Sequence, residues 1–532
     1  MSAISLNKKK KICCLLSPLL FIYAKLINLF VVNIGEVEFF EYLRPFFVLN
    51  AAYFICFYLL YLFSRKSLIH ASLCSVVLII TQFMINDFEY LVIRFLGEIK
   101  IIFRFVIYII LSVIPLFILR RMRDVRFESV KLILTSGMSL LLMAIYPVFK
   151  YTNTFVASNV RHVKLNSDIS KGGDYYVIVL DSYARSDKLR DIYKYDNSDF
   201  LGKLRNDDFF IANKSLSNYE LTMFSLSSFF NMEYVNNLGS PSYTPMYSLL
   251  WSKKMISGGA FFRLMEDSGY KFLTINTGCQ FTHIDNSDIV YSPYYENIRF
   301  TDIISYPHIT NIEYAIFSHT MLTLYFKYHS EFENKGQRRV DIRNGLKALR
   351  DTIAIKDKKI VFAHFLCPHP PFVFDRNGND VDSVDTSVNI NASTSVITPL
   401  NTGTDINIAA YADQARFISN EIGSIVDELI SVNPKCNIII VSDHGGRSLV
   451  DFGDIEKSDL GDAFSNLIAI RLPGVKIDSS YDDLTLVNVF RMIFREKYNE
   501  DIPLIENRQI FNFMTKSKPV DVTDRLRANA RE

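Results

Sequence analysis

The sequence is poor in the residues from which several kinds of site are built. Its 532 residues include one tryptophan, seven cysteines and nine histidines, and the formal net charge is only +2. Three cysteines, Cys279, Cys367 and Cys436, lie outside the apolar first third. Without a CxxC pair they exclude a disulfide framework and a cysteine zinc site, and leave either one bridge or free thiols. The weak net charge and the lack of Walker or GxGxxG patterns give no support to nucleic-acid or nucleotide binding.

What the chain has in quantity is hydrophobic residues. They make up 49% of the sequence, yet 21% of residues are charged. A protein wholly inside a membrane has fewer charges, and a soluble protein has fewer apolar residues. The chain, at 532 residues, is also too long to form a single compact core, so we expect at least two units. The composition therefore indicates a chain that lies partly in lipid and partly in water.

The first part, residues 1–149, is predicted to be a membrane domain. Five apolar runs there approach the length of about 20 residues that a helix needs to cross a bilayer. They cover residues 12–33, 45–63, 67–86, 101–119 and 132–149. The first run contains Lys25, which is explained either by a bundle interior or by an interfacial helix. Basic residues precede the first run and fill alternate loops, so the bias in loop charge places the chain after about residue 150 on the outer side.

The remainder is predicted to be a linker, residues 150–173, and an α/β domain, residues 174–514. Strand-like runs there alternate with helical patterns, which predicts a mainly parallel sheet covered on both faces. The candidate strands are residues 175–181, 271–276, 359–365, 437–442 and 466–471, and the clearest helices are residues 408–432 and 484–497. Residues 376–407 are predicted to form a flexible surface insertion, and residues 515–532 a polar, weakly packed tail.

Candidate metal ligands follow two of the predicted strands, where parallel sheets bind ligands. Asp181 ends the first strand, and a buried carboxylate is costly unless it is paired or bound to metal. It could instead cap the next helix or pair with Arg185. Asp443 and His444 follow another strand and precede two glycines that permit a tight turn. Carboxylate and imidazole ligands suit Zn, Mn or Mg, although a strand-end turn with a capping aspartate gives the same pattern.

Thr222 is the candidate nucleophile. It precedes a helix-like stretch, residues 223–230, where threonine is usually an N-cap. The start of a helix also offers unpaired N–H groups and the positive end of the helix dipole. A hydroxyl there that contacts a divalent cation can lose its proton and attack phosphorus. The local sequence allows both interpretations.

Two histidines and two arginines complete the candidate site. His369 lies between prolines that fix the backbone, so it could bind phosphate or donate a proton, or be an ordinary loop histidine. His364 lies inside a predicted strand and is interpreted as structural. Arg185 and Arg447 could each clamp a phosphate oxygen or pair with the neighbouring acids.

Four segments in this order resemble the sulfatase-like branch of the alkaline phosphatase superfamily. Within it they are similar to the membrane-anchored group of lipoteichoic acid synthases, phosphoglycerol transferases and phosphoethanolamine transferases. The segments are Tyr176 to Asp187 (YVIVLDSYARSD), Ser217 to Tyr234 (SNYELTMFSLSSFFNMEY), His364 to Asp375 (HFLCPHPPFVFD) and Ile438 to Arg447 (IIIVSDHGGR). The resemblance covers roughly residues 170–500. The C/S-x-P-x-R context of true sulfatases is missing at Thr222, which disfavours sulfate ester hydrolysis.

The resemblance implies a role for each matching residue. Asp181, Asp443 and His444 are expected to bind one divalent ion, Thr222 to be both ligand and nucleophile, and His369 to bind phosphate or assist proton transfer. It also implies a multi-pass protein of the bacterial inner membrane with its catalytic domain on the periplasmic or extracellular side. We expect it to move phosphoglycerol, or phosphoethanolamine, from a membrane phospholipid to an envelope glycan. A hydrolase with the same ligands, or an inactive assembly scaffold, are the alternatives.

Overall fold

The computed structural model describes most of the chain, and its contacts divide the chain into two compact units. One unit contains Met1–Val156 with Arg299–Ser330, and the other contains Ala157–Ile298 with Glu331–Glu532. The described residues are 8–32, 42–85, 101–122, 125–154, 165–239, 245–279, 282, 284, 287–291, 313, 316, 320, 334–381, 405–451, 454–511 and 519–529.

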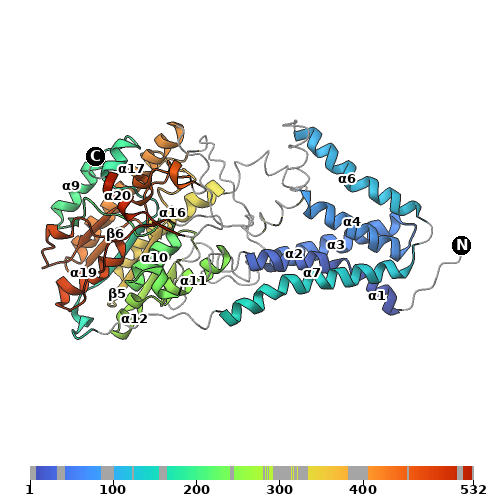
Figure 1. Ribbon diagram of the computed structural model, residues 1–532, viewed down its shortest axis with the longest axis horizontal. Helices are drawn as coiled ribbons and strands as arrows, with labels where there is room; N and C mark the ends of the chain where they lie inside the picture. Colours follow the sequence, from blue (N-terminus) through green and yellow to red (C-terminus); the bar gives the residue numbers. More distant parts are fainter. Residues whose placement is uncertain are drawn as a thin grey trace. The chain divides into compact units, whose positions relative to one another are not determined.

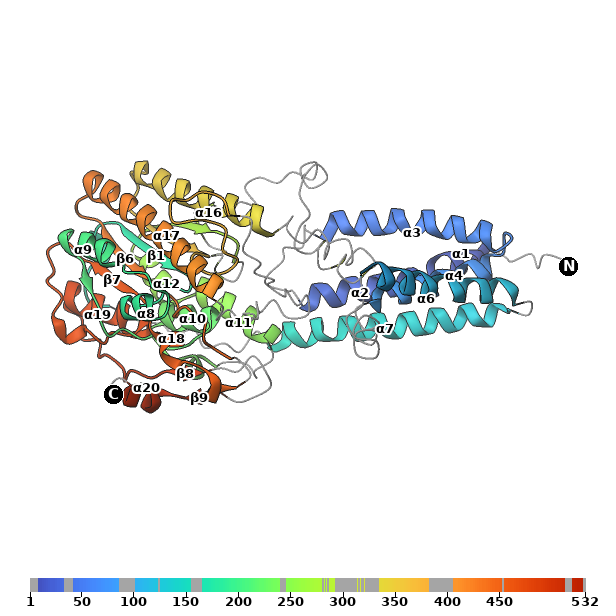
Figure 2. The same ribbon diagram turned by 90° about the horizontal axis from the view of Figure 1, so that it is seen from above.

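The described part of the first unit is mainly helical (Figures 1 and 2). Its helices are α1 (Lys8–Leu16), α2 (Leu19–Val32), α3 (Leu43–Phe63), α4 (Leu68–Phe83), α6 (Ile101–Arg121) and α7 (Phe127–Thr154). The first predicted run is divided between α1 and α2 at Ser17 and Pro18, because proline has no N–H to continue the helical hydrogen bonds. The Ser17 hydroxyl donates to the carbonyl of Cys13 at 2.6 Å.

Three stretches of the described helices are long and apolar enough to cross a membrane. They are Lys8–Val31, Leu43–Phe63 and Phe127–Tyr146, whereas Leu68–Phe83 is apolar but shorter. By length and composition, these stretches coincide with three of the five predicted spans. The fourth predicted run is helical, as α6, and contains Pro115. The number of crossings and their direction stay predictions.

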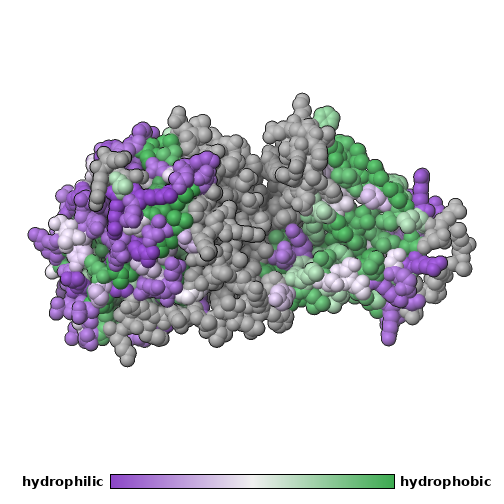
Figure 3. Space-filling model, in the orientation of Figure 1, coloured by the Kyte–Doolittle hydropathy of each residue, from purple (hydrophilic) through white to green (hydrophobic). Residues whose placement is uncertain are grey.

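Exposed apolar side chains are concentrated on these helices (Figure 3). Ile55 on α3 is 63% exposed, and Leu132 and Met143 on α7 are 68% and 71% exposed. Among the described residues of the second unit, only four large apolar side chains are exposed: Val340, Val432, Leu449 and Leu504. Apolar surface of this extent is unfavourable in water and suits a lipid environment, as the composition predicted.

The second unit is built on a seven-stranded sheet with the order β2-β7-β6-β1-β5-β3-β4. The strands are β1 (Tyr175–Leu180), β2 (Phe210–Ile211), β3 (Lys271–Asn276), β4 (Ile289–Tyr291), β5 (Lys359–Phe365), β6 (Asn437–Val441) and β7 (Ile468–Arg471). The five strands from β6 to β4 are parallel, and β7 and β2 pair antiparallel at one edge. This confirms the predicted fold class, a helical region followed by an α/β domain with a mainly parallel sheet.

Alternating residues of β1 enter two separate cores, one on each face of the sheet. Tyr176, Ile178 and Leu180 pack in the core that includes α8 (Ser186–Asp191), α9 (Ser198–Asn206), α16 (Asn334–Asp351) and α17 (Asp405–Val432). Tyr175, Val177 and Val179 pack on the opposite face against α10 (Thr222–Asn231), α12 (Ala260–Asp267) and α19 (Leu486–Tyr498). Because both faces are covered, every residue of β1 is apolar and buried.

The C-terminal tail differs from the prediction of weak packing. There β9 (Val520–Asp521) pairs with β8 (Ile510–Phe511), and α20 (Thr523–Asn529) follows. Val522 and Leu526 are buried in a third core cluster, so spaced apolar residues anchor a polar segment. The predicted insertion, residues 376–407, lies largely outside the described residues, and its last residues already belong to α17.

Candidate metal centre

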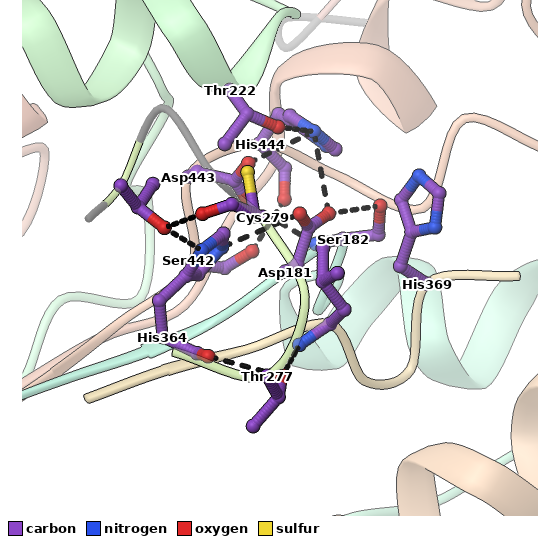
Figure 4. A network of polar contacts seen from close by, with 12 residues as sticks. Asp181, Ser182, Thr222, Thr277, Cys279, His364, His369, Ser442, Asp443 and His444 are labelled. Carbon is purple, nitrogen blue, oxygen red and sulfur yellow. Dashed lines mark hydrogen bonds and ion pairs between the residues drawn. The ribbon is translucent and has the colours of Figure 1, made fainter. Parts of the chain in front are cut away.

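The strand order brings the predicted acidic residues to one place. β1 lies between β5 and β6 and is parallel to both, so the three strands end at the same edge of the sheet. The Asp181 N–H extends the β1–β5 ladder by donating to the carbonyl of Phe365 at 2.9 Å. Asp443 and His444 follow β6, and all three residues are buried. Figure 4 shows their side chains converging, with Thr222 close by.

The turn after β1 fixes the second carboxylate. Ser182 has a φ of 65°, in the left-handed region that non-glycine residues rarely adopt. This conformation lets its N–H donate to Asp443 Oδ1 at 3.1 Å and its hydroxyl donate to Asp181 Oδ1 at 3.0 Å. Tyr411 holds the turn by donating its hydroxyl hydrogen to the Ser182 carbonyl at 2.6 Å. Local strain is thus used to orient both carboxylates.

The two glycines after His444 are required by close packing. A Cβ on Gly445 would lie 2.0 Å from the carbonyl oxygen of Asp462, and one on Gly446 would lie 2.1 Å from the Tyr193 hydroxyl. Tyr193 also donates to the Asp462 carboxylate at 2.8 Å, and burial raises the pKa of Asp462 to about 6. The loop that carries His444 is therefore seated on a buried tyrosine–aspartate pair.

The hydrogen-bond network assigns the proton positions of two imidazoles. Nδ1 of His444 lies 2.9 Å from the Gly445 carbonyl, which only accepts, so Nδ1 carries a proton and Nε2 is the nitrogen that can offer its lone pair to a metal ion. The Thr282 hydroxyl donates to the Cys279 carbonyl at 2.7 Å and therefore accepts from His364 Nδ1 at 3.0 Å. Nε2 of His364 is likewise the nitrogen whose lone pair a metal ion can use. Metal-binding histidines usually have such a hydrogen-bond partner on the ring nitrogen that does not bind the metal, here Nδ1.

These lone pairs face carboxylate oxygens at short range. His444 Nε2 lies 3.0 Å from Asp443 Oδ2 and 3.7 Å from Asp181 Oδ1, and His364 Nε2 lies 3.4 Å from Asp181 Oδ2. Within the described residues, His364 Nε2 and Asp443 Oδ2 have no hydrogen-bond partner. Ligand atoms of Asp181, His364 and Asp443 lie within 4.8 Å of one another. Two carboxylates and two imidazoles this close need a cation among them, either protons or a metal ion, and their ligand atoms fit a divalent metal ion.

Burial and charge act in opposite directions on the two carboxylates. Burial alone would raise the pKa of Asp181, but the nearby imidazoles of His369, His364 and His444 hold it well below its usual value. Burial and the charge of Asp181 would raise the pKa of Asp443, yet His444 and His364 keep it below its ordinary value. Both side chains are therefore carboxylates at neutral pH and available as ligands.

Thr222 is the first residue of α10 and not its N-cap, a position that Leu221 occupies. Its hydroxyl oxygen lies 3.2 Å from His444 Nε2, at the edge of the cluster. Among the described contacts, the N–H groups of Thr222 and Met223 donate to no backbone carbonyl. Thr222 is partly exposed, whereas the other members of the cluster are buried, so it is the member that a substrate can reach.

His369 lies beside this cluster with a fixed tautomer (Figure 4). Its Nδ1–H donates to the carbonyl of Pro370 at 2.6 Å, which leaves Nε2 as an acceptor. Burial lowers the pKa of His369 to about 4; Asp181 opposes this, and Arg447 and Arg338 add to it. At neutral pH the ring therefore presents an acceptor. Proton donation from His369, one of the predicted roles, first requires the ring to take up a proton.

The two predicted arginines have different positions. Arg185 is held by Asp187, with hydrogen bonds of 2.7 and 2.9 Å, and donates to the Ser215 carbonyl at 2.7 Å. These contacts make Arg185 a local brace at the start of α8. Arg447 donates from Nη1 to the Glu220 carbonyl at 2.9 Å, two residues before Thr222. Only Arg447 lies next to the segment that carries the candidate nucleophile.

His364 is a member of the candidate metal cluster that the sequence analysis did not include. It was interpreted as structural because it lies inside a strand, but its Nε2 faces Asp181. The register pairs His364 with Val179 of β1 and with Asn276 of β3, next to the strand ends. A histidine one residue before the end of a central parallel strand is the signal that could have identified it.

No protein-family model and no curated protein matches the sequence. Solved structures of similar fold include the C-terminal periplasmic domain of EptC from Escherichia coli in complex with Zn, at 12% identity and a TM-score of 0.41, covering 68% of this chain and 96% of that one. The lipoteichoic acid synthase LtaP from Listeria monocytogenes matches at 11% identity and a TM-score of 0.38, covering 68% and 82%.

The integral membrane protein lipooligosaccharide phosphoethanolamine transferase A from Neisseria meningitidis matches at 13% identity and a TM-score of 0.36, covering 90% of this chain and 94% of that one. These proteins are of the group that the sequence resembles. At such identities and TM-scores the likeness assigns no role to any residue of this chain.

We predict that purified protein binds divalent metal and that Asp443→Asn lowers its affinity for the metal by more than about a hundredfold, since a buried charged ligand is lost. His364→Gln should also weaken binding. Metal content after dialysis against graded chelator, measured by elemental mass spectrometry, checks both. The control is Asp427→Asn on α17, which removes an exposed carboxylate that pairs with Lys203 of α9. Metal retention by His364→Gln equal to the wild type would remove His364 from the ligand set.

We also predict that His369 stays neutral in the folded, metal-free protein until the pH falls to about 4, below the ordinary histidine pKa of 6.5. Because the folded pKa is depressed, the unfolded chain takes up this proton first, and the stability that depends on neutral His369 is lost as the pH falls from about 6.5 to 4. Carbon-13 NMR titration of labelled histidines, with His369→Gln for assignment, measures it. Titration near pH 6.5 would contradict the prediction.

Proposed function

We propose that the protein is a metal-dependent phosphotransferase that uses Thr222 as its nucleophile. The supporting observation is the convergence of two carboxylates, two imidazole nitrogens and a reachable threonine hydroxyl at one sheet edge. A divalent cation held by Asp181, His364, Asp443 and His444 would lower the pKa of the Thr222 hydroxyl and polarise a phosphoryl oxygen. The imidazole donors favour Zn or Mn over Mg, which prefers oxygen ligands.

In the first half-reaction, a bond forms between Thr222 Oγ1 and phosphorus, and the ester bond from phosphorus to the diacylglycerol oxygen breaks. The hydroxyl proton of Thr222 ends on that leaving oxygen, so the step is balanced. The N–H groups of Thr222 and Met223 at the start of α10 can donate hydrogen bonds to the phosphoryl oxygens and so stabilise the negative charge that develops there. Partial exposure of Thr222 gives the phosphodiester access.

In the second half-reaction, a hydroxyl of the acceptor attacks the phosphothreonine, and the bond from phosphorus to Thr222 Oγ1 breaks. The acceptor proton returns to Thr222. His369 is suited to relay it, because its Nε2 is an acceptor and its pKa of about 4 leaves the ring unprotonated before the transfer. Two displacements at one phosphorus need no further reactant.

The apolar helices of the first unit support a lipid as donor. Their exposed apolar side chains suit a bilayer, and the catalytic unit is on the same chain as the membrane anchor. We propose a membrane phospholipid that carries phosphoglycerol, or phosphoethanolamine, as donor and an envelope glycan as acceptor, with the second unit on the outer side of a bacterial inner membrane. The anchor would keep the donor at high local concentration.

We expect metal-loaded protein in phosphatidylglycerol or phosphatidylethanolamine vesicles to release diacylglycerol, and Thr222→Ala to reduce the rate by about a thousandfold or more, because the nucleophile is removed. Chelator should abolish release and added metal should restore it. The matched control is Ser198→Ala, which removes an exposed hydroxyl from the first residue of another helix, α9.

Tracing the labelled headgroup separates transfer from hydrolysis. Label in the glycan fraction supports the transferase, whereas label only as free headgroup phosphate in the presence of glycan identifies a hydrolase. Metal-loaded wild type that releases no diacylglycerol from either lipid would contradict the proposed donor class.

A further inference from the structure

Two arginines act on the loop that carries His369. Burial is the main cause of the lowered pKa of His369, and the charges of Arg447 and Arg338 add to it. Burial raises the pKa of the neighbouring Cys367, and the charge of Arg338 opposes that rise. Arg447 comes from the loop after β6, whereas Arg338 comes from the first turns of α16, a helix that packs on β5 and β3. The guanidinium groups therefore approach the same edge of the sheet from different elements.

Arg338 reaches the end of β3 from α16. Its Nη1 lies 3.5 Å from the carbonyl oxygen of Thr277, the residue after β3, which is a long hydrogen bond. The same nitrogen lies 3.8 Å from where a Cβ on Gly278 would be. Thr277 also contacts β5, because its hydroxyl donates to the His364 carbonyl at 3.1 Å. Arg338 is thus placed beside the strand that carries His364, and most of its donors remain for a ligand.

The other arginines of α16 are engaged elsewhere. Arg339 donates to the carbonyls of Val373 and Val381. Arg343 pairs with Asp380 at 2.6 Å, where both side chains are about half exposed. Arg338 forms no ion pair with any residue that the structure describes. Of these three arginines on α16, Arg338 is the one whose side chain extends to Thr277 at the end of β3.

Arg447 lies on the side of the cluster where α10 begins. It has a φ of 61° and is 8% exposed. Its Nη1 donates to the Glu220 carbonyl at 2.9 Å, which places it beside the chain that enters α10 at Thr222. A left-handed backbone in a non-glycine residue next to the glycine pair indicates that this orientation is held by the surrounding structure.

The balance of charge shows what these cations can do. A divalent ion with the carboxylates of Asp181 and Asp443 has no net charge, and His369 is neutral at pH 7. A phosphodiester adds one negative charge, and its transition state places more charge on the non-bridging oxygens. Asp341, close to Gly278, and Glu220 are buried acidic residues near the two arginines. The guanidinium groups of Arg338 and Arg447 are cationic side chains whose planar donors can bind those oxygens.

We propose that Arg338 is a phosphate-binding residue of this centre, and that with Arg447 it clamps the non-bridging oxygens of the phosphodiester being transferred. The proposal deepens the proposed function and rests on it, because the clamp serves the same phosphoryl site. The ligand class is a phosphate monoanion or dianion beside the metal. The clamp contacts only the phosphate oxygens, so it does not select the headgroup or the acceptor.

The test is the affinity of the full-length, metal-loaded protein for inorganic phosphate, measured by titration calorimetry in detergent. Arg338→Gln should weaken phosphate binding roughly ten- to a hundredfold, the range for losing one charge-assisted hydrogen bond. Arg338→Lys keeps the charge without the planar fork and should lose less. Arg343→Gln, which removes an exposed arginine from the same helix, should bind as the wild type does. Metal content should be equal in all four proteins.

Unchanged phosphate affinity in Arg338→Gln, or an equal loss in Arg343→Gln, would overturn the clamp. If Arg338→Gln does not fold, Arg338→Lys decides the question: wild-type affinity overturns the proposal, and an intermediate loss supports it. The lipid assay is read separately. If Arg338→Gln binds phosphate more weakly but the wild type releases no diacylglycerol, the clamp is supported and the lipid donor is rejected. If the wild type releases diacylglycerol but Arg338→Gln binds phosphate as the wild type does, the lipid donor is supported and the clamp is rejected.

Discussion

The central constraint on this structure is the crowding of metal-ligand atoms at the carboxyl edge of a parallel sheet, where a cation is needed among them. Two carboxylates and two imidazole lone pairs meet within a buried space, with Asp443 Oδ2 only 3.0 Å from His444 Nε2. Each imidazole has its other nitrogen occupied by a hydrogen-bond acceptor, Gly445 for His444 and Thr282 for His364. Such an arrangement is costly in an empty apolar interior, and a divalent cation converts it into a favourable one.

The rest of the catalytic unit can be understood as the means of holding these atoms. The strand order β6-β1-β5 brings together residues that are far apart in the sequence, from Asp181 to His444. The left-handed turn at Ser182 and the close packing of Gly445 against Asp462 fix the two loops that carry the carboxylates. The start of α10 then presents Thr222 to the cluster, with the N–H groups of Thr222 and Met223 donating to no backbone carbonyl of the described residues. Positioning and electrostatics are the two contributions a phosphoryl-transfer enzyme needs from its fold.

Much of this could be predicted from the sequence. The strands that end at Leu180, Phe365 and Val441 follow predicted apolar runs to within a residue, since fully buried strands are continuous in apolar residues. Asp181, Asp443, His444 and Thr222 were recognisable because chemistry-bearing residues directly follow such runs or begin a helix. His364 was missed because a polar residue inside a strand gives no sign of which neighbour it faces.

Tertiary contacts decided the remaining cases. Arg185 looked equivalent to Arg447, but Asp187 lies two residues away and binds it locally. Arg338 lies in a polar helix where no periodicity distinguishes it from Arg339 or Arg343. The burial of Val522 depends on pairing between β8 and β9, which the polar composition of the tail conceals.

The measurement that tests the account most directly is the intact mass of the full-length protein after incubation with metal and phospholipid, followed by mapping of the modified peptide. The account predicts a headgroup-phosphate adduct on Thr222 that requires the metal and is absent from Thr222→Ala. Turnover of the lipid without any adduct on a trapped or rapidly quenched sample, or an adduct on another residue, would contradict the assignment of Thr222 as nucleophile.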